Sequence, residues 1–401
     1  MLLVNMFPAS YGDSFLIQYL EDKKSENILV DCGFADTFND HIEPALQKLP
    51  AGSTLERLII THLDRDHING AVPFLEANGS KSVPRLIPIR QIWHNTLRHM
   101  QSSKLPVSNN TAVEEVRLDA YIAEHQENDN HVEGIISAKT SSDLGALILR
   151  GKYDWNTDFN EQAVTAEMPT SVAISDNLSL ILLGPTRARL EDVEYMFKKS
   201  LARIGIDLDK RNDIIDDAFE VFVSNKWDED LQLEGSIGRV SPYSFLTIED
   251  VKDLAKPDLY KPDDAEPNGS SITFILLSEG KRLLFMADSF SEDMEAALDG
   301  QDGFFNLIKI SHHGAHKNTS PSLLSMIDSE RYLISTNGNH PRHLHPDAQT
   351  IARIVSRPLR NGMAKRTLYF NFVTPTSKLF CNPALQEYFH YDIKIAGEIT
   401  L

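Results

Sequence analysis

Two apolar segments of this sequence end in clusters of histidine and aspartate, and this pattern constrains the fold more than any other feature. Residues 55–61 read LERLIIT, and residues 306–311 read NLIKIS. Short apolar runs of this kind are typical of strands that are buried on both faces of a sheet. Directly after the two runs come His62, Asp64, Asp66, His67, His312 and His313. Because α/β proteins carry their functional sites at the carboxyl ends of such strands, we expect these side chains at a sheet edge.

The order of the predicted elements favours an α/β fold. The elements that we expect in the first third are strands at 2–7, 14–19 and 27–30, a helix at 36–49, the strand at 55–61, and a helix that begins after His67. In the last third strands return, and we expect a helix at 347–355 and a strand at 367–373 to close the fold. A length of 401 residues allows two or three domains, but sheet-rich α/β folds also reach this size as one unit, so we predict a single domain over 1–401.

Residues 204–266 differ from the rest of the chain in charge. They hold 17 acidic and 7 basic residues, so −10 of the total net charge of −19 lies in these 63 residues. Thr247 and Asp250 have the spacing of a helix start. We predict an acidic helical insertion outside the core, which could cover a cleft, form a homodimer interface or bind a partner.

The residue types of the two clusters indicate a transition metal. Imidazole and carboxylate ligands together suit Zn, Mn or Fe better than Ca or Mg, and without a nearby cysteine a structural zinc site is disfavoured. Asp288 ends another apolar run, where a carboxylate can bridge two ions, and Asp31 ends strand 27–30 as a candidate acceptor for a ligating histidine. The alternatives are a solvated turn with two chance histidines at 62–67 and an ordinary helix cap at Asp288.

These residues, in this order, resemble the metallo-β-lactamase superfamily. The matching elements are Asp31 before Gly33, the core motif of His62, Asp66 and His67, the late Asp288, and a histidine after the strand that follows. The subtype resembles the ComEC-related competence branch. The features that point to this branch are Gly12-Asp13-Ser14, Asp64 in place of a histidine, Asn268 and Ser271 before Asp288, His312-His313-Gly314, and His345-Pro346.

The resemblance implies a four-layer αββα sandwich with a metal site at the shared edge of two sheets. It implies that Asp66, His67, Asp288 and one of His312 and His313 hold one ion. It further implies that His62, Asp64 and the bridging Asp288 contribute to a second position, with catalysis by a metal-bound hydroxide. Asn268 stands where a further histidine is common, so we expect this second position to bind weakly, to prefer Mn or to stay empty.

Other residues complete the candidate site. We assign catalytic roles to Asp66 and to His345, the latter as a substrate-binding or proton-donating group. Asp31, Asn268 and Asp13 are candidates for contacts to the ligands or the substrate. His94, which ends a predicted strand at 90–94, is a spare ligand, although a core histidine beside Trp93 is the more ordinary interpretation.

The leading functional hypothesis is a metal-dependent hydrolase with one or two ions, Zn first and Mn or Fe as alternatives, acting on a phosphodiester as a nuclease or phosphodiesterase. Hydrolysis of a small ester, lactone or cyclic nucleotide is the alternative within this class. A di-iron oxidoreductase and a non-catalytic, metal-stabilised binding module are alternatives of different classes. The excess of 19 acids argues against strong nonspecific binding to DNA, because phosphate neutralisation needs Lys and Arg.

The remaining composition bears on the cell compartment. Cys32 and Cys381 are the only cysteines, and both lie in apolar stretches, which fits a reducing compartment. The N-terminus has no basic region before its apolar run, and no stretch reaches the length of a membrane helix. We expect a cytoplasmic protein without membrane contact.

Overall fold

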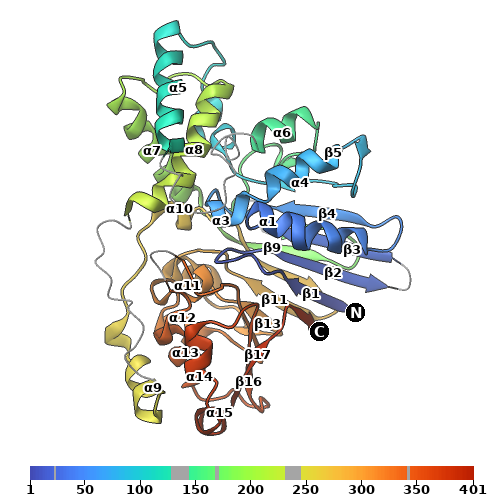
Figure 1. The fold of residues 1–401 in the computed structure, drawn as a ribbon, viewed down its shortest axis with the longest axis vertical. Coiled ribbons are helices and arrows are strands. Elements are labelled where there is room, and N and C mark those ends of the chain that lie inside the picture. Colours follow the sequence, from blue (N-terminus) through green and yellow to red (C-terminus); the bar gives the residue numbers. More distant parts are fainter. Residues whose placement is uncertain (22–23, 128–143, 168–170, 231–244, 341–343) are drawn as a thin grey trace.

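Two β-sheets are stacked at the centre of the structure and are covered by helices on both outer faces (Figure 1). The structure is a computed structural model that describes residues 1–21, 24–127, 144–167, 171–230, 245–340 and 344–401. In this described part of the chain, no helix has the length and apolarity that crossing a membrane requires.

The first sheet has the strand order β18-β1-β2-β3-β4-β7 among the described residues. In that order its strands are Glu398–Thr400, Leu2–Met6, Phe15–Glu21, Lys24–Val30, Thr54–Ile59 and Ile92–Trp93. Strands β1, β2 and β3 form an antiparallel meander, whereas β4 runs parallel to both β3 and β7. The parallel arrangement places the carboxyl ends of β3 and β4, and therefore Asp31 and the cluster that begins at His62, at one edge.

The second sheet has the order β17-β16-β15-β13-β11-β10-β9-β8 in the same part of the chain. In that order its strands are Tyr391–Ile395, Arg366–Phe370, Arg331–Ile334, Leu307–Lys309, Lys281–Phe285, Thr273–Ser278, Ser179–Gly184 and Ser171–Ala173. Strands β11, β13, β15, β16 and β17 are parallel neighbours, while β10 pairs with β11 through the predicted turn at Glu279 and Gly280.

Apolar side chains from both sheets form the layer between them. In β2, Phe15 and Ile17 point into this layer, whereas Leu16 belongs to the cluster on the outer face, as the two-residue period of a strand requires. Phe15 packs edge-to-face on Phe285 of β11 with 5.6 Å between ring centroids. These contacts hold the sheets face to face, so that their site-bearing edges meet.

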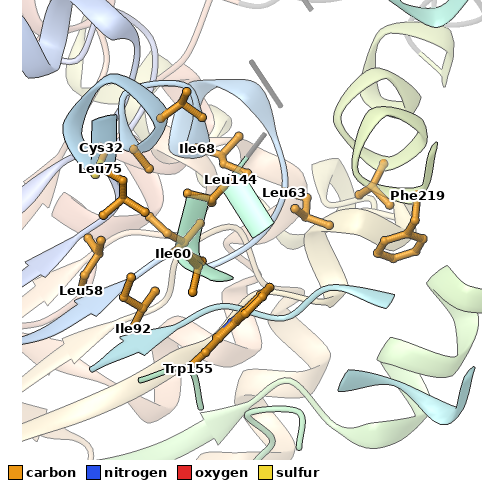
Figure 2. Close-up of a cluster of buried hydrophobic side chains, with 14 of the residues drawn as sticks. Cys32, Leu58, Ile60, Leu63, Ile68, Leu75, Ile92, Leu144, Trp155 and Phe219 are labelled. Atoms are coloured by element: carbon orange, nitrogen blue, oxygen red, sulfur yellow. The ribbon is translucent and has the colours of Figure 1, made fainter. Parts of the chain in front are cut away.

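Helices cover the outer face of each sheet. The helical segments at the first sheet are α1 (Ala35–Thr37), η1 (Phe38–Ile42), α2 (Glu43–Gln47), α3 (Arg65–Ile68), α4 (Ala71–Asn78) and α6 (Leu144–Arg150). Figure 2 shows part of their cluster, in which Leu58 of β4 and Ile92 of β7 lie with Leu75 of α4 and Leu144 of α6. The helices at the second sheet are α11 (Ser291–Leu298), α12 (Pro321–Met326), α13 (Ala348–Val355), α14 (Pro375–Phe380) and α15 (Pro383–Phe389). The fold is therefore a four-layer αββα sandwich.

The acidic segment is helical, as predicted, but the expectation that it lies outside the core is wrong. Helix α8 (Asp213–Asp230) buries Ile215 and Phe219 against α5 (Ala112–Glu127) and α7 (Arg187–Arg203), and Phe219 lies 5.2 Å from Phe197. Helix α9 (Ile248–Leu254) begins at the predicted cap, Thr247, and packs on the other side of the molecule with the second sheet's helices. Apolar residues recur on one face of α8, which overall composition does not reveal, and two of its acids, Asp216 and Glu220, are buried as well. The domain boundaries stay a prediction.

The strand near residue 370 does not close the fold, contrary to expectation. Helices α14 and α15 follow it, each with a proline in its first turn, and β17 then adds to the second sheet. The last strand, β18, returns to the first sheet and pairs with β1. Cys381 lies between the two helices and is exposed, whereas Cys32 is buried, and both thiols are free.

Candidate metal centre

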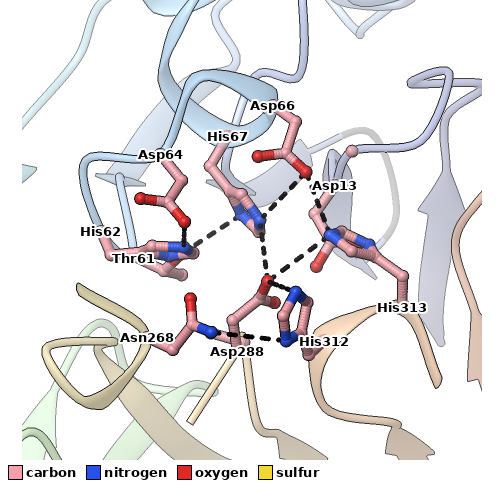
Figure 3. A network of polar contacts seen from close by, with 12 residues as sticks. Asp13, Thr61, His62, Asp64, Asp66, His67, Asn268, Asp288, His312 and His313 are labelled. Carbon is pink, nitrogen blue, oxygen red and sulfur yellow. Dashed lines mark hydrogen bonds and ion pairs between the residues drawn. The ribbon is translucent and has the colours of Figure 1, made fainter. Parts of the chain in front are cut away.

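The two predicted clusters and Asp288 meet at the shared edge of the sheets (Figure 3). The turn after β4 supplies His62 and Asp64, and α3 supplies Asp66 and His67. Helix α4 begins at Ala71, after His67 as predicted, but a one-turn helix that the sequence did not predict, α3, begins earlier at Arg65, with Asp64 as its N-cap residue. A helix that starts earlier places Asp66 and His67 on one rigid turn.

The second sheet contributes through two short, conformationally restricted segments. Asp288 follows β11, and His312 and His313 follow β13. Ala287, His312 and His313 have φ values of 42°, 46° and 52°, which L-residues rarely adopt, and Asp31 in the first sheet has a φ of 54°. Such backbone conformations are costly and are retained where the surrounding structure fixes them, typically at functional sites.

Four ligand atoms form the centre of the cluster. His67 Nε2 lies 3.9 Å from Asp66 Oδ2 and 3.5 Å from Asp288 Oδ2. His313 Nε2 lies 3.1 Å from the same Asp66 oxygen and 3.5 Å from the same Asp288 oxygen. Ligands at about 2.1 Å from one tetrahedral ion are about 3.4 Å apart, so the four histidine-to-aspartate distances are close to those between the ligands of a transition-metal ion.

The two ring nitrogens of this cluster, Nε2 of His67 and Nε2 of His313, are buried and have no hydrogen-bond partner among the described residues. The same holds for Nε2 of the neighbouring His62. A buried nitrogen or oxygen without a partner costs free energy, whereas a metal ligand uses its lone pair in coordination. The residues therefore fit a divalent metal ion.

A second position lies beside the first. One ligand atom each of His62, His67 and Asp288 lie within 4.8 Å of one another. Asp64 Oδ2 is 3.4 Å from His62 Nε2. Asn268 lies beside Asp288 and His312, and its Oδ1 is buried without a hydrogen-bond partner (Figure 3). This position therefore combines imidazole nitrogens with carboxylate oxygens.

Buried carboxylates dominate the electrostatics of the site. Burial by itself opposes the charged form of every group here, but opposite charges outweigh it. Asp288, Asp13 and Asp66 raise the pKa of His313 to about 10, and Asp288, Asp66 and Asp31 raise the pKa of His67 well above its usual value. The imidazoles in turn hold the pKa of Asp288 well below its usual range. Such a site favours cations, and a metal ion can take the place of the imidazole protons.

His67 is oriented by neighbours on the first sheet. Its Nδ1 donates to Asp31 Oδ2 over 2.8 Å, and Thr61 holds the Asp31 carboxylate with its backbone N–H and its hydroxyl, each at 2.8 Å. The structure thus places Asp31 where the sequence predicted an orienting acceptor. The proton on Nδ1 leaves Nε2 of His67 to face the centre.

Of the two adjacent histidines, His313 belongs to the four-atom group. His313 Nδ1 donates to the Ser335 carbonyl over 2.9 Å, which turns Nε2 towards Asp66. His312 approaches from the side of Asn268, with its Nε2 3.7 Å from Asp288 Oδ2. Burial lowers the pKa of His312, so this imidazole favours the neutral form.

Lys309 is a site residue that the sequence analysis missed. It is 1% exposed, its Nζ pairs with Asp13, and it lies 3.6 Å from Asp288 Oδ1. Asp13 also lies 3.3 Å from His313 Nδ1, so it contacts the outer side of the centre. A lysine inside the otherwise apolar run NLIKIS was the available signal, because a buried lysine needs a partner.

His345 lies at the rim of the site, as predicted, and Asp347 was missed as its partner. The side chain of His345 is 14% exposed, and its ring centroid is 5.3 Å from that of His312. Asp347 Oδ2 lies 3.4 Å from His345 Nδ1 and accepts from the backbone and the ring of His316. His345 is thus more accessible than the four buried histidines of the centre.

The spare histidine, His94, is not part of the candidate metal groups. It is fully buried and stacks on Trp155, with ring centroids 6.0 Å apart. Burial lowers its pKa to about 3, so it is a neutral core residue.

A family model matches the first third of the chain. Residues 8–136 match the model described as the metallo-beta-lactamase superfamily. No curated protein matches the sequence significantly. A solved structure to which the chain is similar is Zn(2+)-bound PqqB from Methylobacterium extorquens, with 10% identity, 100% of each chain covered and a TM-score of 0.38. With this family match over 8–136 and its two sheets packed as an αββα sandwich, the chain has a metallo-β-lactamase fold.

Proposed function

We propose that the protein is a metal-dependent hydrolase that cleaves a small phosphodiester. The observation that carries the proposal is the convergence of Asp66 Oδ2, His67 Nε2, Asp288 Oδ2 and His313 Nε2 in one buried cluster. Structural ion pairs would satisfy these atoms with hydrogen bonds, but the ring nitrogens of His67 and His313 that face the cluster have none among the described residues.

In this proposal Asp66, His67, His313 and Asp288 hold one ion, Zn first and Mn or Fe as alternatives. A bound ion of this kind would polarise the scissile phosphoryl group and lower the pKa of water. His62 and Asp64 would contribute to a second position with Asp288, where the carboxylates also suit Mn. Asp288 would serve both positions, because it forms a group with His62 and His67 and its Oδ2 also faces the ring nitrogen of His313.

His345 acts in this proposal as the general acid for the leaving group. Burial alone would raise the pKa of Asp347, but the contacts with His345 and His316 outweigh burial and hold this pKa below its usual value, so the carboxylate stays ionised. An ionised Asp347 holds the Nδ1 side of His345, which leaves Nε2 to deliver a proton to the departing oxygen. This role suits the rim of the site, where the leaving group must be released.

The charge of a neighbouring groove supports a small substrate over a nucleic-acid polymer. A groove of about 560 Å³ lies beside Asp263, whose Oδ2 is 3.9 Å from His312 Nδ1. The charged side chains that line the groove are Asp192, Asp263, Asp264, Glu266, Glu292, Arg189 and Lys199. Five carboxylates against two basic groups repel a polyanion, whereas a single phosphodiester charge can be neutralised by the metal centre. Assignment to the ComEC-related branch, and with it nuclease activity, stays a prediction.

Substrate profiling tests the proposal. Protein loaded with Zn or Mn is assayed on bis-p-nitrophenyl phosphate, cyclic dinucleotides, single-stranded DNA, RNA and simple esters. We expect hydrolysis of the small phosphodiesters, with little activity on polymers. Activity on esters alone would contradict the phosphodiester assignment, and no turnover of any substrate would contradict the hydrolase.

Substitutions separate the roles of the residues. Asp288→Ala should abolish activity, and His345→Ala should lower kcat by about 10²–10⁴-fold on substrates with poor leaving groups, because a general acid contributes a factor of this size. The loss should be much smaller for p-nitrophenolate, which leaves without protonation. His41→Ala, on the helical cover of the first sheet, is the control. Equal losses on good and poor leaving groups would contradict the general-acid role of His345.

A further inference from the structure

The acidic segment reaches the metal centre through its last residues. Asp263 lies just before α10 (Glu266–Gly269), and its side chain is 8% exposed. Its backbone N–H donates to the carbonyl of Lys317, in the turn after the histidine pair, over 3.3 Å. The carboxylate is thereby held against His312 and two asparagines, Asn268 and Asn318.

The Asp263 carboxylate determines how both asparagine amides are oriented. Oδ2 of Asp263 accepts from Asn268 Nδ2 over 2.6 Å and from Asn318 Nδ2 over 2.9 Å. Nδ2 of Asn318 also faces the carbonyl oxygens of Asp288 and Ser289, at 3.1 and 3.3 Å. All these partners are acceptors, so the atom that faces them must be the amide nitrogen.

The orientation of Asn318 decides where His312 carries its proton. With Nδ2 turned to Asp263, the oxygen of Asn318 lies 3.0 Å from His312 Nδ1. An amide oxygen only accepts, so this contact needs a proton on Nδ1 of His312. Nδ2 of Asn268 lies farther from the same nitrogen, at 3.4 Å, and donates to Asp263 over 2.6 Å, so the shorter contact to Asn318 decides that Nδ1 is the donor. A neutral imidazole with its proton on Nδ1 has none on Nε2, and Nε2 is the atom that faces Asp288.

We infer that Asp263 is a positioning residue that fixes the proton of His312 on Nδ1 through the amide of Asn318. His312 then presents an unprotonated Nε2 to the metal centre, where it can coordinate an ion or accept a proton from the substrate water. The inference deepens the proposed function and rests on it for its catalytic consequence, but the tautomer of His312 is a property of the folded chain alone.

Asp264 offers a matched control because it is the next residue, carries the same charge and is exposed. In protein labelled with ¹⁵N-histidine, long-range ¹H–¹⁵N spectra report which ring nitrogen is protonated, and a His312→Gln variant assigns the signal. We expect the Nδ1–H tautomer in the wild type and in Asp264→Ala, and a shift towards Nε2–H in Asp263→Ala. Asp263→Asn replaces one carboxylate oxygen by an amide nitrogen, so it should shift the tautomer part of the way towards Nε2–H, and it keeps the test available in case Asp263→Ala fails to fold.

Kinetics complete the test. Residues that orient a ligating histidine typically change metal affinity or activity by about 10–100-fold, and we expect a loss of this size in kcat/KM for Asp263→Ala but less than about twofold for the His41→Ala control. Asn318→Ala should lower kcat/KM by as much as Asp263→Ala, and the variant with both substitutions should lower it no further, because both residues act on His312 through the same contact. An unchanged His312 tautomer in both Asp263 variants would overturn the inference, whatever the activity. A changed tautomer with no turnover in any variant would instead overturn the proposed function.

Discussion

Replacing Lys309 by methionine tests the electrostatics of the centre. The side chain is 1% exposed, pairs with Asp13, lies 3.6 Å from Asp288 Oδ1 and donates to the Ala287 carbonyl over 3.0 Å. At an effective dielectric constant of about 20, the attraction over 3.6 Å is worth about 5 kcal/mol. Methionine fills nearly the same space but leaves two buried carboxylates without this cation. Since removing one partner of a buried ion pair costs about 3–5 kcal/mol, we expect Lys309→Met to lower the free energy of unfolding of metal-free protein by that amount.

Lys365 provides the matched control. It also pairs with an aspartate, Asp392, but the two side chains are 53% and 36% exposed. A surface pair of this kind contributes at most about 1 kcal/mol. Urea unfolding of Lys309→Met and Lys365→Met, followed by the fluorescence of buried Trp93 and Trp155, gives both changes in free energy on one scale.

The loss of stability in Lys309→Met can be compared with that in Lys365→Met, and it can be measured with and without Zn. If Lys309→Met lost no more stability than Lys365→Met, Lys309 would not compensate the buried carboxylates. Saturating Zn should recover part of the loss, because the ion neutralises Asp288, whereas Asp13 remains uncompensated. An identical loss with and without Zn would mean that no cation binds at Asp288.

Two further perturbations probe the same site. Nearby carboxylates raise the pKa of His313 to about 10 in the metal-free protein, so this histidine must release a proton when the ion binds. We therefore expect the Zn affinity to rise with pH between 6 and 9, and titration calorimetry in two buffers to detect the released proton. An affinity that does not depend on pH would contradict this prediction. The same raised pKa stabilises the metal-free fold below pH 6.5, and this contribution should disappear as the pH rises towards 10, which thermal melts of chelator-treated protein would show as a falling midpoint. Gly12→Ala would place a Cβ 2.0 Å from the Asp66 carbonyl, so we expect it to displace the turn that carries Asp66 and His67 and to weaken metal binding; unchanged affinity would refute this.

The site residues that could be predicted from the sequence are those that directly follow a strand. His62, Asp66 and His67 follow β4 of the first sheet, and Asp288 follows β11 of the second, so the rule that functional residues follow strand ends identified each group. Asp31 was predicted for the same reason. Each of these residues is within a few positions of a strand end. The resemblance to the metallo-β-lactamase superfamily predicted that the two edges meet.

The unpredicted residues reach the site by tertiary contact alone. Asp263 lies in a segment whose acidic composition masks its contacts, and nothing in its neighbours marks it as buried. Asp347 and Asn318 look like ordinary loop or cap residues until the fold places them beside His345 and His312. Lys309 carried a signal, since a lysine in a buried strand needs a carboxylate, but the sequence did not identify Asp13 as that partner.

Some elements outside the site were also not predicted from the sequence. Ile215, Phe219, Phe222 and Val223 recur at helical spacing in α8, a pattern that predicts a buried face despite the surrounding acids. Strand β18 is three residues long and pairs with β1 across almost the whole chain, and such a contact has no local signature.

The most direct test of the metal centre is elemental analysis of protein purified without chelators, combined with thermal melts in added Zn and Mn. The arrangement of Asp66, His67, Asp288 and His313 predicts at least one transition-metal ion per chain, or a raised melting temperature on adding Zn or Mn, and Asp288→Ala should lose this response. The absence of metal together with a melting temperature that neither ion changes would contradict the metal centre and the hydrolase built on it.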